Sequence, residues 1–137
     1  MIKVHFCRSS LPAAWLIRAG TMSRWNHVAI EVDGVIFHST GWKGVHVTTT
    51  EALQADYKVE TVDIDGLQET AVTTFLKSQL GKGYDWGAVF AMPFRADWHD
   101  PKKWFCSELV AATLEAGGRE FRIKGHRVTP RDLWIAL

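Results

Sequence analysis

One cysteine and two histidines have side chains, and predicted positions in the secondary structure, that suit covalent catalysis. Cys106 stands where a loop becomes the helix predicted over residues 106–116, so its sulfur lies at the positive end of a helix dipole. A helix N-terminus and a nearby imidazolium lower the pKa of a thiol and favour a nucleophilic thiolate. His27 can supply that imidazolium, and His38 can hold its ring in one tautomer. The sequence therefore predicts a Cys106–His27–His38 catalytic triad.

A β-hairpin is expected to position the two histidines. Residues 27–32 and 35–40 are β-branched runs joined by Asp33-Gly34, a pair favoured in two-residue type I′ turns. Such a turn pairs Val32 with Val35, Ile30 with Phe37 and Ala29 with His38.

Side-chain alternation then sorts the hairpin into two faces. The expected core face carries Val28, Ile30, Val32, Val35 and Phe37. The opposite face carries His27, Ala29, Glu31, Ile36, His38 and Thr40. The two histidines are diagonal neighbours on it, roughly 7 Å apart at the backbone, so their rings can meet.

The remaining pattern predicts short elements on either side of this hairpin. The expected strands are residues 2–6, 44–47 and 57–64. The expected helices run from Ser10 to Gly20, over 51–55 after a Thr50 cap, over 67–80 after an Asp65/Gln68 capping box, over 106–116 before Gly117-Gly118, and after a Thr129 cap. A second apolar stretch covers 83–94, and a loop follows over 95–104. This order predicts an α+β fold in which an antiparallel sheet packs against helices.

Length and composition narrow the class of protein. The chain has 137 residues, 47% hydrophobic and 23% charged, which fits one globular domain spanning 1–137. A net charge of +1 gives no bulk attraction to nucleic acid, and no window is long and apolar enough for a transmembrane segment. The N-terminal residues lack a secretory signal pattern, so a cytoplasmic location is expected. No residue pattern calls for a cofactor or metal.

The candidate residues also carry a resemblance to a known superfamily. The run His27-Val-Ala-Ile-Glu-Val-Asp-Gly-Val-Ile-Phe-His38 resembles the histidine strand and third-residue strand of NlpC-type papain-like cysteine peptidases. Tyr84-Asp-Trp and Phe105-Cys-Ser-Glu-Leu-Val look like their nucleophile segment, and the match extends from Trp25 to Leu114. The histidine precedes the cysteine here, as in the circularly permuted branch with YiiX/YaeF-like amidases and lecithin:retinol acyltransferase relatives.

This resemblance implies a permuted papain-like fold and a cysteine hydrolase from a bacterium or a phage. Peptidoglycan peptides or N-acyl and lipid compounds are the implied substrates. YiiX-like relatives often carry a carboxylate as the third residue, whereas His38 agrees with ordinary NlpC-type enzymes, so Glu31 is a second candidate for orienting His27.

Other residues have both a functional and a packing interpretation. Tyr84, Trp86 and Trp104 are candidate substrate-binding residues; core packing explains Tyr84 equally well and is the favoured interpretation of the two tryptophans. Phe90, Phe94 and Trp98 extend the same aromatic group. Cys7 is interpreted as a packing residue, and four histidines are given no role: His5, His46, His99 and His126.

The leading hypothesis is hydrolysis of an amide or ester through an acyl-enzyme on Cys106, with its backbone N–H as one oxyanion donor. The same residues in a site that excludes water would transfer the acyl group to an amine or alcohol. In a different class, Cys106, His27 and His38 would bind zinc, since one thiolate and two imidazoles suit a tetrahedral site. A binding domain without catalysis is the remaining alternative.

Overall fold

A computed structural model describes residues 1–9, 19, 23–85, 87, 102–122 and 128–137. In this structure the protein is α+β, with an antiparallel five-stranded sheet and helices, which confirms the expected class. The helix expected between Ser10 and Gly20, most of the apolar stretch after Tyr84 and the loop over 95–101 lie outside the described residues.

The main sheet has the strand order β4-β3-β2-β1-β5. Its strands are β1 (Ile2–Arg8), β2 (His27–Val32), β3 (Val35–Thr40), β4 (Gly44–Thr48) and β5 (Lys58–Ile64). The N-terminal strand β1 lies between β2 and β5 and pairs antiparallel with both. All strand pairs in this sheet are therefore antiparallel, and β2 is an interior strand.

The β2–β3 turn is the predicted two-residue hairpin. Asp33 and Gly34 have φ values of 49° and 82°, as a type I′ turn requires at both central positions. Val32 faces Val35 and Ile30 faces Phe37, as predicted. The registered pairs end at Ile30–Phe37, so the predicted pair of Ala29 with His38 is not among them. Beyond that point the segment before the helix at Cys106 binds β3 instead, through Ser39 Oγ and the Trp104 carbonyl, 2.8 Å apart.

Four helices surround the sheet in the described part of the chain: α2 (Thr50–Asp56), α3 (Glu69–Gln79), α5 (Cys106–Ala116) and α6 (Pro130–Ala136). The ends of α5 and the Thr129 cap of α6 agree with the prediction. The cap of α2 is Thr49 and not Thr50, since the Thr49 hydroxyl accepts the Ala52 N–H. The predicted capping box of α3 is also wrong, because its cap residue Gln68 makes no side-chain hydrogen bond.

A short second sheet joins two segments that the sequence had left apart. Strand β6 (Gly83–Tyr84) pairs in parallel with β7 (Lys103–Trp104). The adjoining chain holds this sheet against β4, because Val45 N–H donates to the Lys82 carbonyl at 2.8 Å. Trp104 is thereby placed directly before Phe105, the cap residue of α5.

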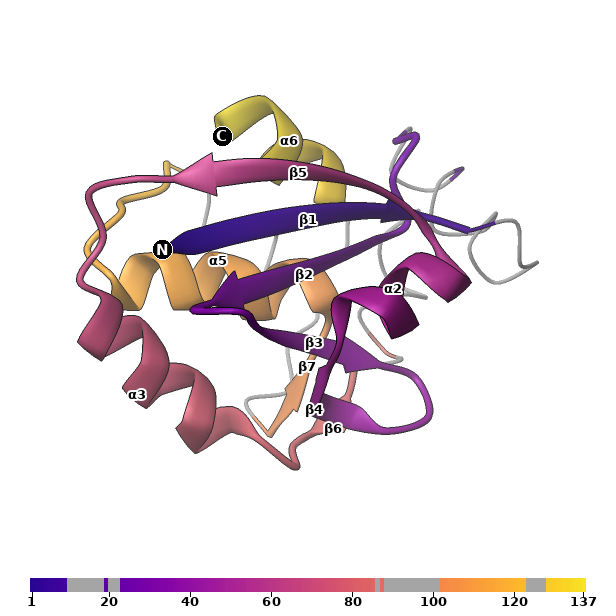
Figure 1. The fold of residues 1–137 in the computed structure, drawn as a ribbon, viewed down its shortest axis with the longest axis horizontal. Helices are drawn as coiled ribbons and strands as arrows, with labels where there is room; N and C mark the ends of the chain where they lie inside the picture. The colour runs from indigo at the N-terminus through magenta and orange to yellow at the C-terminus, as the bar shows by residue number, and fades with distance from the viewer. Residues whose placement is uncertain (10–18, 20–22, 86, 88–101, 123–127) are drawn as a thin grey trace.

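Both faces of the main sheet are covered, as Figure 1 shows with α5 behind β1 and β2 and α2 in front. The larger core packs α5 against the expected hairpin face, including Val28, Ile30 and Phe37. The expectation that Val35 belongs to this core is wrong: it is 45% exposed at the end of the hairpin. The opposite face contains a smaller apolar cluster of Cys7, Ala29, Ile36 and Leu53.

Candidate active site

Cys106 is the first residue of α5, as the sequence predicts. The turn that carries it is fixed by two bonds around Phe105. The Phe105 N–H donates to Glu108 Oε2 at 3.1 Å, and the Phe105 carbonyl accepts the Leu109 N–H at 3.0 Å. The first bond satisfies the Phe105 N–H, which a helix N-terminus otherwise leaves open, and the second is the first regular bond of the helix; together they fix where the sulfur lies.

The Cys106 sulfur is buried, with 1% of the residue exposed. Burial raises its pKa to about 12, although the backbone N–H groups of Val28, Ser107 and Cys106 itself favour the thiolate. The predicted lowering of the thiol pKa is therefore wrong, because desolvation outweighs the helix N-terminus. The contact with the Val28 N–H nevertheless places the sulfur beside the peptide that joins His27 to Val28.

His27 begins β2 and is 5% exposed. Its ring stacks on Tyr57, with centroids 5.1 Å apart and an angle of 21° between the planes. Burial lowers the pKa of His27 well below its ordinary value, and the nearby His38 and His46 lower it further. The expected imidazolium at His27 is therefore wrong for the resting protein: the ring is neutral and available as a base.

The structure brings His27 and His38 together, as the sequence predicts. His27 Nε2 lies 3.0 Å from His38 Nδ1, and both residues are buried. Glu31, the alternative partner for His27, is bound elsewhere: its Oε2 lies 2.8 Å from His5 Nε2. His38 is thus the residue that contacts the candidate base, and Glu31 is not.

A third imidazole, that of His46, is hydrogen-bonded to His38. The sequence pattern had suggested no role for it. His38 Nε2 lies 2.9 Å from His46 Nε2, and His46 Nδ1 lies 2.9 Å from the Gly44 carbonyl. His46 faces His38 across the β3–β4 pairing. The signal in the sequence was this register, because a turn over residues 41–43 sets the two histidines opposite one another on adjacent strands.

With one proton on each of the three rings, these contacts determine which nitrogen carries it. The Gly44 carbonyl can only accept, so His46 carries its proton on Nδ1 and accepts at Nε2. His38 must then donate from Nε2 and accept at Nδ1, and His27 must donate from Nε2. The lone pair of His27 is therefore on Nδ1, the nitrogen that makes none of these contacts.

The predicted substrate-binding residues contribute to packing near the nucleophile. Tyr84 contacts Phe105 edge to face, with ring centroids 5.8 Å apart. Burial raises the pKa of Tyr84 well above its ordinary range. Trp104 donates its indole N–H to Gln79 Oε1 at 2.9 Å and packs against Phe75. Trp86 and the other aromatic residues of the proposed groove, Phe90, Phe94 and Trp98, lie outside the described residues.

Two further titratable residues of β1, His5 and Cys7, are held by contacts within the fold. His5 Nδ1 lies 2.8 Å from Thr61 Oγ1, and its other ring nitrogen contacts Glu31. Cys7 is buried in the smaller cluster, as predicted, and burial raises its pKa. His99 and His126 lie outside the described residues.

The zinc alternative does not fit the described residues, which contain no group of three metal-ligating side chains that could hold an ion. The reason is geometric. His38 uses both ring nitrogens toward other imidazoles, so the nitrogen lone pairs do not converge on one point. Likewise, no helix in the described ranges has the length and apolar character needed to span a bilayer.

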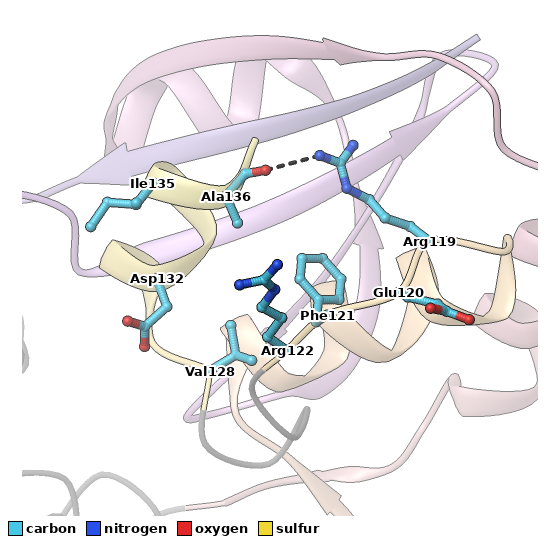
Figure 2. A pocket seen from close by; sticks show the side chains of 8 residues that line it. All are labelled: Arg119, Glu120, Phe121, Arg122, Val128, Asp132, Ile135 and Ala136. Carbon is cyan, nitrogen blue, oxygen red and sulfur yellow. Dashed lines mark hydrogen bonds between the residues drawn. The ribbon is translucent and has the colours of Figure 1, made fainter.

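A cavity of about 310 Å³ lies apart from the histidines, between α6 and the segment after α5. Figure 2 shows Phe121 and Ile135 on its walls and Arg119 bonded across it to the Ala136 carbonyl. This volume is at the small end for ligand pockets. None of the candidate catalytic residues lines it.

The candidate site therefore combines a thiol at a helix N-terminus with a chain of three imidazoles anchored at a backbone carbonyl. A neutral thiol can react with a neutral base within its reach by transferring its proton during attack. Neither a family model nor a curated protein matches this chain.

Proposed function

We propose that this protein is a cysteine hydrolase of the amidase or peptidase type, with Cys106 as nucleophile, His27 as general base and His38 as the residue that orients His27. The proposal includes a circularly permuted papain-like (NlpC-type) arrangement. It rests on one observation above all: the ring of His27 is bound to His38 at 3.0 Å, and the Cys106 sulfur at the start of α5 contacts the backbone N–H of Val28, the residue next to His27.

The reaction begins from neutral groups. As the Cys106 sulfur attacks the carbonyl carbon of an amide, the thiol proton passes to His27 Nδ1, and a tetrahedral oxyanion forms. The Cys106 backbone N–H is the proposed donor to that oxyanion. His27 then protonates the leaving nitrogen as the C–N bond breaks, which leaves a thioester on Cys106 and a free amine.

Water completes the cycle. His27, neutral again, takes a proton from water as the water oxygen attacks the thioester carbonyl, and the C–S bond breaks. The carboxylic acid leaves, and the thiol recovers its proton from His27. Peptidoglycan peptides and N-acyl or lipid compounds are the substrate classes proposed from the sequence resemblance.

Acyl transfer is a second candidate, favoured by the burial of the site. Cys106, His27 and His38 are 1%, 5% and 6% exposed, and a site that excludes water protects a thioester from hydrolysis. An amine or alcohol would then take the acyl group from Cys106. Product analysis with an added amine separates the two: an N-acyl product indicates transfer, and free acid alone indicates hydrolysis.

The test uses an acyl p-nitrophenyl ester and intact-mass measurement. We expect one acyl adduct, mapped to Cys106, with release of nitrophenol. Cys106→Ala should form no adduct, and His27→Ala should acylate on the order of 10²–10⁴ more slowly, which is the range of general-base contributions.

Cys7→Ala is the matched control, because Cys7 is the other free cysteine and is equally buried. Its acylation should equal that of the parent. Equal acylation of the parent and of Cys106→Ala, or an adduct that disappears only in Cys7→Ala, would contradict the proposal.

A further inference from the structure

The structure contains a group that the proposed catalytic triad does not use. His46 is half-buried on β4 and lies at the end of the imidazole chain. Its own anchor is main chain: Nδ1 lies 2.9 Å from the carbonyl of Gly44, two residues earlier. Since a carbonyl oxygen has no proton to give, this contact has only one possible direction.

We infer that His46 is a positioning residue that fixes the tautomer of His27 through His38, so that His27 presents an unprotonated Nδ1 as the base. This inference rests on the proposed function for its catalytic meaning. Its structural content, the direction of the hydrogen bonds, stands independently of any reaction.

On its own, His38 does not determine the tautomer of His27. The Nδ1 atom of a neutral His38 can accept a hydrogen bond from His27 or donate one to it. If it accepts, His27 carries its proton on Nε2. If it donates, His27 carries its proton on Nδ1. With His46 Nε2 as an acceptor 2.9 Å from His38 Nε2, the His38 proton belongs on Nε2. His38 then accepts from His27, and the His27 lone pair is on Nδ1.

A positively charged His46 would reverse the direction of the hydrogen bonds between the three imidazoles. With protons on both nitrogens it would donate to His38 Nε2, His38 would donate from Nδ1, and His27 would carry its proton on Nδ1. His38 faces His46 from β3, and the basic residues on the neighbouring segments are Lys43 in the preceding turn and Lys82, whose carbonyl accepts the Val45 N–H. Within the described ranges no carboxylate forms an ion pair with His46.

The experiment reads the tautomers directly, by two-bond ¹⁵N–¹H correlation spectra of the histidine rings at neutral pH. In the parent protein we expect protons on Nδ1 of His46 and on Nε2 of both His38 and His27. His46→Phe keeps an aromatic ring but removes the acceptor, and should move the His27 proton partly or wholly to Nδ1. His46→Gln places a carbonyl acceptor near the former Nε2 and should restore the parent tautomer.

Activity gives a second readout. His46→Phe should lower kcat on the order of 10- to 100-fold with little change in KM, and His46→Gln should recover most of it, because general-base catalysis contributes about 10²–10⁴-fold. His5→Phe is the matched control. His5 is another buried histidine of the sheet with hydrogen bonds at both ring nitrogens, but it does not belong to the hydrogen-bonded series of His27, His38 and His46. This variant should leave the His27 tautomer and kcat unchanged.

A His27 proton on Nδ1 in the parent, or an Nε2 proton that persists in His46→Phe, overturns the inference. The parent spectrum decides the first point even if a variant does not fold. If instead the tautomers behave as expected but Cys106 forms no acyl adduct, the proposed function fails and the tautomer assignment remains.

Discussion

At the scale of single residues, burial decides the resting state of the candidate site. The start of α5 supplies backbone N–H groups to the Cys106 sulfur, yet removal from water raises the thiol pKa to about 12. The same cause lowers the pKa of His27. A thiolate–imidazolium pair would place two charges where both are poorly solvated, so the neutral pair is favoured at rest.

The buried histidines should make stability depend on pH. Burial, and after it the electrostatic influence of the nearby His46 and Lys43, lowers the pKa of His38 from 6.5 to about 4. The unfolded chain binds a proton at His38 below about pH 6.5, and the folded protein does not, so stability falls as pH falls toward 4. This one group should cost about 2 kcal/mol between pH 8 and pH 5. Urea unfolding at the two pH values measures it.

His38→Gln is the comparison for that measurement. Without the imidazole, the difference in unfolding free energy between the two pH values should shrink by about 2 kcal/mol, from the same linkage. His27 contributes in the same direction, because its pKa is also lowered, so some pH dependence should remain in the variant. An identical difference in the parent and the variant would show that His38 is not held neutral by the fold.

At the scale of elements, Gly44 joins β4 to both the second sheet and the imidazole chain. It has a φ of 62°, and a Cβ there would overlap the Lys82 carbonyl. Its own carbonyl accepts the His46 Nδ1 proton. Gly34 in the hairpin turn has a positive φ as well, but a Cβ there would meet no other atom within 4 Å.

Substitution of these two glycines by alanine should therefore have unequal effects. Gly34→Ala should cost on the order of 1–2 kcal/mol, the strain of a side chain at positive φ. Gly44→Ala adds a backbone overlap to the same strain and should cost more, and it should also disturb the His46 ring. Urea unfolding of both variants, with the histidine NMR spectra, checks this. A Gly44→Ala cost no larger than that of Gly34→Ala would contradict the close packing of β4 on the Lys82 segment.

At the scale of the whole molecule, the sheet separates two apolar clusters of different size. Leu109 of α5 lies in the larger cluster, whereas Leu53 is the buried residue of α2 and belongs to the smaller one. His27 stacks on Tyr57 at the end of α2, so the smaller cluster supports the candidate base.

Truncation in the two clusters should have different consequences. Leu109→Ala should lower the unfolding free energy by about 2–5 kcal/mol, the usual range for a fully buried leucine. Leu53→Ala should mainly release α2 and Tyr57, and should raise hydrogen exchange in α2 while α5 stays protected. Hydrogen exchange with urea unfolding distinguishes these results. Equal loss of protection in α2 and α5 after Leu53→Ala would mean that the two clusters unfold as one.

Local chemistry in the sequence was enough to predict several features. The Asp33-Gly34 turn determined the hairpin register, and alternation along the strands then put His27 and His38 within contact. The ends of α5 followed from a helical apolar pattern and Gly117-Gly118. These predictions depended only on residues close together in the chain.

Other properties of the site and the fold arise from contacts between segments that are distant in the sequence, and they became visible only in the folded molecule. The desolvation of Cys106 and the partner of Glu31 required knowing what packs over each group. The role of His46 required the β3–β4 register, and the parallel pairing of β6 with β7 joins segments about twenty residues apart. Spacing in the sequence specifies which side chains share a strand face, but burial and hydrogen-bond direction are set by groups from elsewhere in the fold.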